Sequence, residues 1–255
     1  MKDLFSLQGR IALVTGGSRG IGRMIATGLL SHGARVYISS RKVDACDQTA
    51  LELSALGPCF SLPADVSTVD GAKGLAAAFA AREPALDILV NNAGAAWGES
   101  FDTFPEKGWD KVMDLNLKSP FFLTQALHEQ LRTAARTRPA KVINVASIDG
   151  VSVNPLETYS YAASKAGLIH LIKRMSLRLV QDNIVVSGIA PGAFASEMNK
   201  VARDHGEETA RRIPAGRIGI DEDMAGVAVY LASRAGDYVV GQTIVVDGGV
   251  TLARG

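Results

Sequence analysis

The chain has 255 residues, of which 47% are hydrophobic and 21% are charged, a size and composition typical of one ordinary α/β domain. Lys and Arg together number 27 and Asp and Glu 26, so no net charge attracts nucleic acid or an anionic membrane. No secretory signal peptide and no run of about 20 apolar residues is recognisable. Cys46 and Cys59 form neither a CxxC motif nor a cluster with histidines, so we expect a reduced, cytoplasmic protein without a metal site.

Short β-rich segments alternate with helical patterns along the chain, which is typical of parallel βαβ units. Several of the β-rich segments are apolar without interruption, which indicates burial on both faces of a sheet. In chain order, we predict strands at residues 10–15, 35–39, 59–62, 87–91, 141–147, 184–189 and 243–246, with helices at residues 20–32, 43–56, 71–81 and 160–182 between them.

This order predicts an α/β fold, a Rossmann-type doubly wound parallel sheet of about seven strands flanked by helices. No linker or repeat divides the chain, so we expect one dinucleotide-binding and catalytic domain over residues 1–255. Residues 194–219 fit neither the helical nor the strand period. We expect them to form a loop over the substrate site.

A glycine-rich segment, TGGSRGIG at residues 15–22, separates the first predicted strand from the first helix. Gly16, Gly20 and Gly22 permit a tight turn and let the backbone approach a pyrophosphate. The helix that begins near Gly20 points its free N–H groups and its positive dipole end at that anion. The glycines alone are compatible with a simple strand–helix turn, but their place after the first strand favours dinucleotide binding.

The end of the second predicted strand indicates which dinucleotide is bound. An acidic residue at this place usually holds the ribose diol of NAD, but the chain has Ser39, Ser40 and Arg41 here. Arg41, with Arg19 from the glycine segment, suits the 2′-phosphate of NADP. Arg41 is also compatible with a plain surface charge at a helix start. We predict a preference for NADP(H).

Tyr161 and Lys165 lie four residues apart on a predicted helix, so their side chains share one face. By itself such a pair is compatible with a surface contact. It becomes a candidate catalytic site because Ser147 ends the fifth predicted strand and Asn116 lies in a helical stretch.

With these residues in place, the chain resembles the short-chain dehydrogenase/reductase family over essentially its whole length. The motifs follow in order: TGGSRGIG at 15–22, Asp65-Val66, NNAG at 91–94, Asn116, Ser147, YAASK at 161–165 and Pro191-Gly192. Among family members, the chain looks most like 3-oxoacyl-(acyl carrier protein) reductases. The resemblance implies hydride transfer between a nicotinamide and a carbonyl or secondary alcohol.

The resemblance also implies roles for the four candidate catalytic residues. Tyr161 would donate a proton during carbonyl reduction and accept one during alcohol oxidation. Lys165, together with the positive charge of an oxidised nicotinamide, would lower the pKa of Tyr161. Lys165 would also bind the nicotinamide ribose. Ser147 would hold and polarise the substrate oxygen. Asn116 would anchor a water that relays protons from Lys165.

For the cofactor, the resemblance implies an adenine contact from Asp65 and a passage of residues 92–94 under the adenosine ribose. The backbone after Pro191 would face the nicotinamide carboxamide. The expected cofactor-binding residues are Gly16, Ser18, Arg19, Gly20, Ile21, Gly22, Ser40, Arg41, Asp65, Val66, Asn92, Ala93, Gly94, Tyr161, Lys165, Pro191, Gly192 and Ser196.

The substrate remains open between two classes at this point. Residues 95–98, 148–155 and 194–212 are the expected pocket walls and mix apolar with polar side chains. A 3-oxoacyl thioester, with or without an acyl carrier, is one candidate, although Asp182 stands where such reductases often have a basic carrier-docking residue. Arg136 and Arg138 offer basic alternatives. A sugar acid, polyol or cyclic alcohol is the other class.

Two further expectations concern turnover and assembly. A protein that binds NADP(H) and senses redox state without turnover is the alternative from another functional class. It is disfavoured because Asn116, Ser147, Tyr161 and Lys165 are all present. The resemblance implies a homotetramer, and residues 167–179 and 244–249 are compatible either with its interfaces or with a monomer core.

Overall fold

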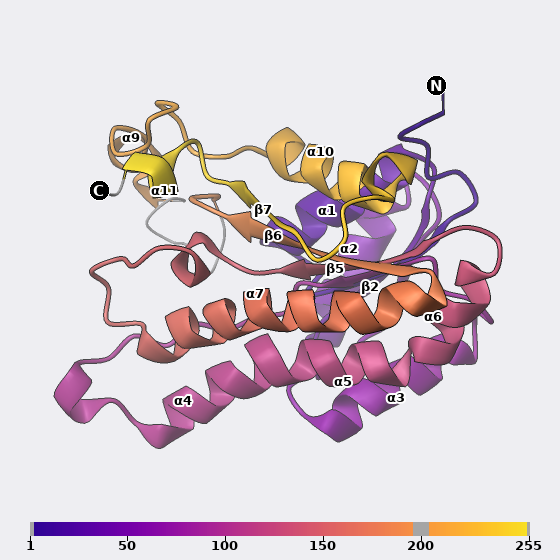
Figure 1. The fold of residues 1–255 in the computed structure, drawn as a ribbon, viewed down its shortest axis with the longest axis horizontal. Coiled ribbons are helices and arrows are strands. Elements are labelled where there is room, and N and C mark those ends of the chain that lie inside the picture. Colours follow the sequence, from indigo (N-terminus) through magenta and orange to yellow (C-terminus); the bar gives the residue numbers. More distant parts are fainter. Residues whose placement is uncertain (1–2, 196–203, 254–255) are drawn as a thin grey trace.

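Seven parallel strands form one sheet in the computed structural model, which describes residues 3–195 and 204–253. Their order is β3-β2-β1-β4-β5-β6-β7 (Figure 1). The later strands are therefore added on both sides of the central pair β1 and β4. This confirms the predicted doubly wound sheet. The strands are β1 (Ile11–Thr15), β2 (Arg35–Ser39), β3 (Cys59–Ser61), β4 (Ile88–Asn91), β5 (Ala140–Val145), β6 (Ile184–Pro191) and β7 (Thr243–Val246).

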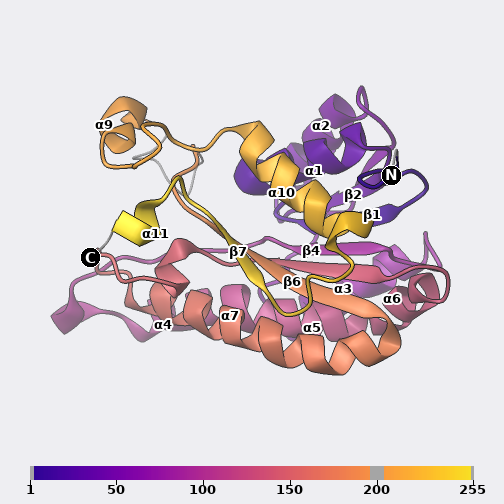
Figure 2. The same ribbon diagram turned by 45° about the horizontal axis from the view of Figure 1, so that its top comes forward.

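Helices cover both faces of the sheet and produce three layers (Figures 1 and 2). α1, α2 and α10 lie on one face, and α3 to α7 lie on the other. None of the helices within the described ranges is long and apolar enough to cross a membrane. The helices are α1 (Gly20–Ser31), α2 (Val43–Leu53), α3 (Val69–Ala80), α4 (Glu106–Met113), α5 (Ser119–Ala126), α6 (His128–Ala135), α7 (Tyr159–Leu179), α9 (Gly206–Ala210), α10 (Asp221–Ala232) and α11 (Val250–Ala253).

The central strand β1 shows why the strands must be apolar without interruption. Ala12, Leu13 and Val14 are all fully buried. Successive side chains of a strand point to opposite faces, so Ala12 and Val14 join the core under α1 and α10, while Leu13 joins the core under α3 and α7. A polar residue at any of these positions would be buried without a partner.

Between β4 and β5 the structure contains three helices whose bounds the sequence pattern did not give. α4, α5 and α6 are each eight residues long and therefore show little more than two turns of helical period. Pro120 and the π-helical turn Asp114–Lys118 further interrupt that period. The helical setting of Asn116 was expected, and the structure confirms it.

The predicted loop over residues 194–219 is more ordered at its ends than its composition suggests. Phe194 and Gly219 form a parallel β-bridge, and the ring of Phe194 fills the space that a Cβ on Gly219 would need. α9 lies between them. α7 begins at Tyr159, one residue before the predicted helix start.

The close approach of α1 to α10 gives a test of packing against helix propensity. A Cβ on Gly28 of α1 would lie 2.7 Å from Ala225 Cβ, whereas a Cβ on Gly226 of α10 would meet nothing within 4 Å. We expect Gly28→Ala to lower the free energy of unfolding by about 1–3 kcal/mol through overpacking. We expect Gly226→Ala to raise it by about 0.5–1 kcal/mol through helix propensity. Urea denaturation of both variants measures their free energies of unfolding. Equal changes in the two variants would contradict the close contact of Gly28 with α10.

Candidate active site

The candidate residues gather at the edge of the sheet where the strands end. The glycine segment follows β1, residues 92–94 follow β4, Ser147 follows β5, and Gly192 follows β6. Because the strands are parallel, these four loops meet at one edge, and the sheet changes its winding direction between β1 and β4. A crevice forms at such a switch point and is the usual ligand site of doubly wound folds.

The glycine segment is shaped to leave the start of α1 accessible. Gly16 and Gly20 have φ values of +65° and +50°, which favour glycine. A Cβ on Gly16 would lie 2.7 Å from Asn92 Nδ2, and a Cβ on Gly22 would overlap Gly16 O. No side chain of the described residues caps α1, so its first N–H groups remain available for an anion. This cradle fits a dinucleotide pyrophosphate.

Thr15 and Asn92 join this segment to the loop after β4. The Thr15 hydroxyl accepts hydrogen bonds from Asn92 N at 3.0 Å and from Ala93 N at 3.1 Å. The Asn92 side chain donates to Thr15 O at 2.9 Å. Thr15 was not among the expected site residues, because a threonine at the end of a strand carries no signal of this contact. Asn92 and Ala93 thus lie beside the glycine segment. The passage of residues 92–94 under the adenosine ribose stays a prediction.

Two arginines lie where an adenosine 2′-phosphate is expected. Gly17 N donates to Ser39 O at 3.2 Å, which places the glycine segment beside the end of β2. Thr49 of α2 donates to Ser18 O at 3.0 Å and fixes the same segment. Arg19 and Arg41 are exposed and form no ion pair with the other described residues. Two free guanidiniums without an acid at this strand end suit NADP.

The loop after β3 reaches the same edge. Ala64 N donates to Ser40 O at 3.1 Å, so Asp65 and Val66 follow directly beside the end of β2. Asp65 accepts from Ser67 N at 3.0 Å and is exposed, while Val66 is buried. At the other side of the crevice, Gly192 N donates to Val246 O at 2.9 Å, and Pro191 is buried. Ser196 lies outside the described residues.

Asn116 is held by both of its side-chain groups. Its Oδ1 accepts from Ala95 N at 2.8 Å, and its Nδ2 donates to Ala95 O at 2.9 Å and to Ser164 Oγ at 3.1 Å. Gly94 lies beside it, since a Cβ there would be 3.2 Å from Asn116 Oδ1 and 3.8 Å from Lys165 Nζ. The structure therefore brings Asn116 close to Lys165. A π-helical turn often marks a functional site.

Ser147, Tyr161 and Lys165 also come together. The short 3₁₀ turn Ile148–Gly150 after Ser147 contacts α7 closely, because a Cβ on Gly150 would lie 2.6 Å from the Lys165 carbonyl carbon. Ser147 forms a side-chain hydrogen bond with Tyr161. Lys165 Nζ donates to Val145 O at 2.8 Å and lies 5.6 Å from the centre of the Tyr161 ring. These contacts join β5 to α7 at the site.

Burial governs the electrostatics of Tyr161. Burial raises the pKa of Tyr161 to about 12, a hydrogen bond from Ser147 opposes this rise, and the negative charge of Asp149 adds to it. Burial also lowers the pKa of Lys165 to about 8. In the protein without cofactor, burial therefore outweighs any lowering of the Tyr161 pKa by Lys165, because burial disfavours the charged form of both groups. The lowering expected from Lys165 together with an oxidised nicotinamide stays a prediction.

The contacts of Tyr161 and Lys165 suit proton transfer at a substrate oxygen.

Within residues 3–195 and 204–253, no group of three or more His, Cys, Asp or Glu side chains is placed to hold a metal ion.

The arginine pair predicts a loss specific to the phosphorylated cofactor. We expect Arg19→Gln and Arg41→Gln each to weaken NADPH binding roughly tenfold or more and to change NADH binding little, because only NADPH carries the 2′-phosphate. Fluorescence titration with both nucleotides measures this. Arg23→Gln is the matched control, since Arg23 on α1 is paired with Glu52 at 2.9 Å. An equal loss for NADPH and NADH would contradict the assignment.

Comparisons with known proteins agree with this geometry. A family model described as enoyl-(acyl carrier protein) reductase matches residues 16–251. The chain is 48% identical to the rhamnolipids biosynthesis 3-oxoacyl-[acyl-carrier-protein] reductase of Pseudomonas aeruginosa, over 99% of this chain and 100% of the relative. It is 40% identical to the 2-dehydro-3-deoxy-D-gluconate 5-dehydrogenase of Escherichia coli, over 98% of both chains.

A solved structure shows the same likeness in three dimensions. The P. aeruginosa RhlG/NADP active-site complex superposes with a TM-score of 0.95 at 47% identity, covering 98% of this chain and 100% of that one. Identity at this level extends over almost the whole chain, as does the family model. The chain therefore belongs to the short-chain dehydrogenase/reductase family and is an NADP-dependent oxidoreductase that transfers a hydride between nicotinamide and a carbonyl or secondary alcohol.

Proposed function

We propose that this protein reduces a 3-oxoacyl thioester to the 3-hydroxyacyl thioester with NADPH. The observation that carries this choice is the apolar segment between Ser147 and Tyr161. Val151, Val153 and Leu156 are 51%, 92% and 68% exposed there. These residues lie in the segment that joins Ser147 to Tyr161, and exposed apolar side chains there suit an acyl chain better than a polyhydroxylated sugar. The 48% identical relative from P. aeruginosa is named a 3-oxoacyl reductase.

The geometry supports a defined division of work at the carbonyl. The glycine segment and the start of α1 would hold the pyrophosphate, and Arg19 and Arg41 the 2′-phosphate. NADPH, when bound, supplies the hydride. Ser147 would donate a hydrogen bond to the carbonyl oxygen, and the Tyr161 hydroxyl would give that oxygen its proton. Lys165, held at Val145 O, would position the nicotinamide ribose and restore the proton to Tyr161.

The electrostatics favour the reductive direction at neutral pH. With its pKa raised to about 12, Tyr161 keeps its proton there and is ready to act as an acid. Alcohol oxidation needs the phenolate, which becomes abundant only as the pH rises toward that pKa.

Asp149 favours the acyl substrate over the sugar-acid alternative. It lies two residues after Ser147, its backbone N–H donates to Ser147 Oγ at 3.1 Å, and its charge acts on Tyr161. A carboxylate at this place repels a substrate that carries its own carboxylate near the reacting carbonyl. Sugar-acid dehydrogenases are nevertheless among the relatives, so this alternative is tested directly below.

The candidate docking position for an acyl carrier has both acidic and basic side chains. Asp182, at the candidate docking position, accepts from Arg178 at 2.7 Å and from His128 at 3.0 Å. These partners hold the pKa of Asp182 below its usual range, so its carboxylate stays charged. An acidic carrier would be attracted by the guanidinium of Arg178 and repelled by the carboxylate of Asp182. We propose that small free thioesters are turned over as well as carrier-bound ones.

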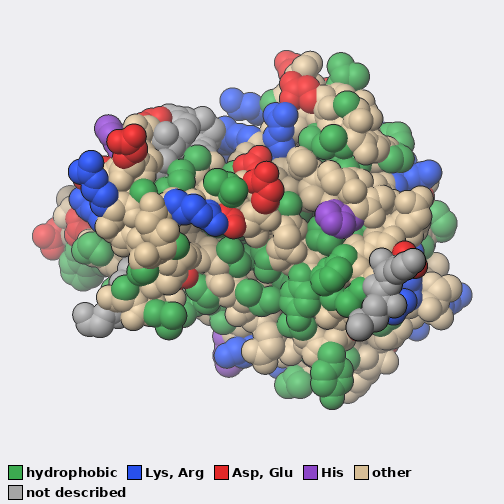
Figure 3. Space-filling model, turned by 90° about the horizontal axis from the view of Figure 1, so that it is seen from above, with side chains coloured by type: hydrophobic (Ala, Val, Ile, Leu, Met, Phe, Trp, Pro, Cys, Tyr) green, Lys and Arg blue, Asp and Glu red, His purple; other side chains and the backbone are tan. Residues whose placement is uncertain are grey.

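We also propose the family homotetramer and a cytoplasmic location. Among the described strands, β7 pairs with β6 alone, and Val245 is 37% exposed at this edge of the sheet. Hydrophobic side chains gather on the face that carries β7 and α10 (Figure 3). On α5 and α7, Phe121 and Leu177 are exposed too. A partner subunit would cover these surfaces. Cys46 and Cys59 are free and buried, which suits a reducing compartment.

Removing the phenol hydroxyl tests the proposed function. We expect Tyr161→Phe to lower kcat for NADPH-dependent reduction of 3-oxoacyl thioesters by roughly 100-fold or more, because no other group there donates the proton. NADPH oxidation is followed at saturating thioester. Tyr159→Phe, two residues away and exposed, is the control and should retain activity. A wild-type protein that binds NADPH but turns over no ketone, thioester or alcohol would support the redox-sensor alternative instead.

Removing the charge of Asp149 tests both substrate class and pH dependence. Asp149 raises the pKa of Tyr161, so Asp149→Asn should lower that pKa and move the alkaline rise of alcohol oxidation to lower pH. It should also raise the kcat/KM for keto-sugar acids relative to 3-oxoacyl thioesters, by roughly tenfold. A wild-type enzyme that prefers the keto acids would refute the acyl proposal.

A further inference from the structure

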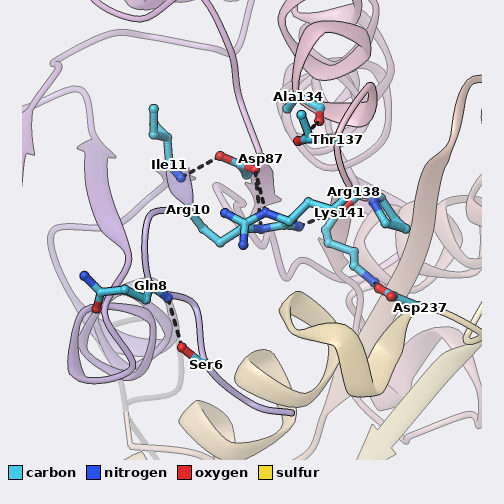
Figure 4. A network of polar contacts seen from close by, with 11 residues as sticks. Ser6, Gln8, Arg10, Ile11, Asp87, Ala134, Thr137, Arg138, Lys141 and Asp237 are labelled. Carbon is cyan, nitrogen blue, oxygen red and sulfur yellow. Dashed lines mark hydrogen bonds and ion pairs between the residues drawn. The ribbon is translucent and has the colours of Figure 1, made fainter. Parts of the chain in front are cut away.

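A second cluster of charged side chains lies at the opposite edge of the sheet, where the strands begin (Figure 4). Arg10 directly precedes β1, Arg138 lies just before β5, and Arg234 starts the 3₁₀ turn Arg234–Gly236 after α10. A cavity of about 180 Å³ opens between them, and Asp3 and Gln8 also line it. None of these residues takes part in the site described above.

Arg10 and Arg138 share one carboxylate. Asp87 Oδ1 lies 3.5 Å from Arg10 Nε and 3.7 Å from Arg138 Nε, and its other oxygen accepts from Ile11 N at 2.9 Å. Both guanidinium distances are too long for a good charge-assisted hydrogen bond. Arg10 is 4% exposed, and its Nε has no hydrogen-bond partner among the described residues. Arg10 Nη2 donates to Pro139 O at 2.7 Å, so the buried guanidinium is partly hydrogen-bonded and its Nε is the N–H without a hydrogen bond among the described residues.

The other charged side chains near the cavity do not supply a further partner for Arg10. Lys141 Nζ binds Asp237 at 2.6 Å and occupies that carboxylate. Arg234 is exposed and forms no ion pair within the described ranges. Asp3 is the remaining acid in the wall. Burial lowers the pKa of Arg10 to about 10, and the nearby charge of Arg138 adds to this, while the carboxylates of Asp87 and Asp237 oppose it.

Helix dipoles do not explain the buried member of the cluster. α6 and α10 end near this edge, and the negative ends of their dipoles favour exposed bases such as Arg136 and Arg234. Arg10 precedes a strand, so no helix end accounts for it. The Nε of Arg10 is buried without a hydrogen bond among the described residues, and such an N–H group is costly unless a further partner is bound.

We propose that this cavity binds a small oxyanion, a phosphate or carboxylate group held by Arg138 and Arg234 with Arg10 behind them. Guanidinium forks match the oxygens of both groups. The cavity accommodates a phosphate or a metabolite of a few carbon atoms, since sites for larger ligands start at roughly 300 Å³. The five residues of β1 separate the cavity from the glycine segment by roughly 17 Å. An oxyanion in the cavity therefore does not compete with NADP.

Calorimetric titration of the NADP⁺-saturated enzyme with inorganic phosphate tests the proposal. Saturation fills the cofactor's own phosphate sites, and chloride at equal ionic strength corrects for screening. Acetate in a parallel titration distinguishes a carboxylate ligand from a phosphate ligand. We expect saturable phosphate or acetate binding in the wild type. Arg138→Gln and Arg234→Gln should each weaken it roughly tenfold.

Two further variants separate the cavity from general surface charge. Arg136→Gln removes an equal charge from an exposed residue outside the cavity wall and should leave binding unchanged. Asp3→Asn removes the acid that opposes an anion and should strengthen binding. All four side chains are at least partly exposed, so the variants should fold. No anion binding beyond the chloride reference, or binding that is equal in Arg136→Gln, Arg138→Gln and Arg234→Gln, would overturn the proposal.

Discussion

The hydrogen bonds between Thr15 and Asn92 are the constraint on which the cofactor edge depends. β1 and β4 are neighbours in the sheet, but the chain leaves them in opposite winding directions, so the loops that follow them separate. Thr15 Oγ1 and the Asn92 side chain hold the first residues of those loops together. The glycines at 16 and 22 make this approach possible, because a Cβ on either would collide with Nδ2 of Asn92.

Burial governs the chemistry at the other half of the site. It acts in opposite directions on Tyr161 and Lys165, raising the pKa of the phenol and lowering that of the ammonium. Both shifts reduce charge in a closed space, and the shift of Tyr161 keeps the phenol protonated at neutral pH in the protein without cofactor. Ser147 opposes the rise of the Tyr161 pKa by hydrogen bonding, while Asp149 reinforces it. In the proposed reduction, a protonated phenol is the form that gives a proton to the carbonyl.

The two edges of the sheet bind charge by different means. At the cofactor edge, α1 begins and offers free N–H groups, so backbone alone can hold an anion. At the opposite edge, α6 and α10 end, and their exposed carbonyl groups favour cations. An anion there depends on side chains, and the buried Arg10 with Arg138 and Arg234 supplies them. This division follows from the parallel sheet, in which every helix on a crossover runs opposite to its strands.

The sequence by itself determined the doubly wound sheet, the glycine cradle, the arginine pair and the four catalytic candidates. Each of these rests on local spacing in the chain, such as apolar runs, glycines after a strand, and Tyr161 one helical turn from Lys165. The tertiary structure decided the features that depend on contacts between distant segments or on burial. It defined the short helices α4 to α6, whose few turns give a weak period, and it assigned Thr15 its partner 77 residues away. It also set the direction of the Tyr161 pKa, since burial is a property of packing, and it brought Arg10 and Arg138 together from the starts of two strands that are separate in sequence.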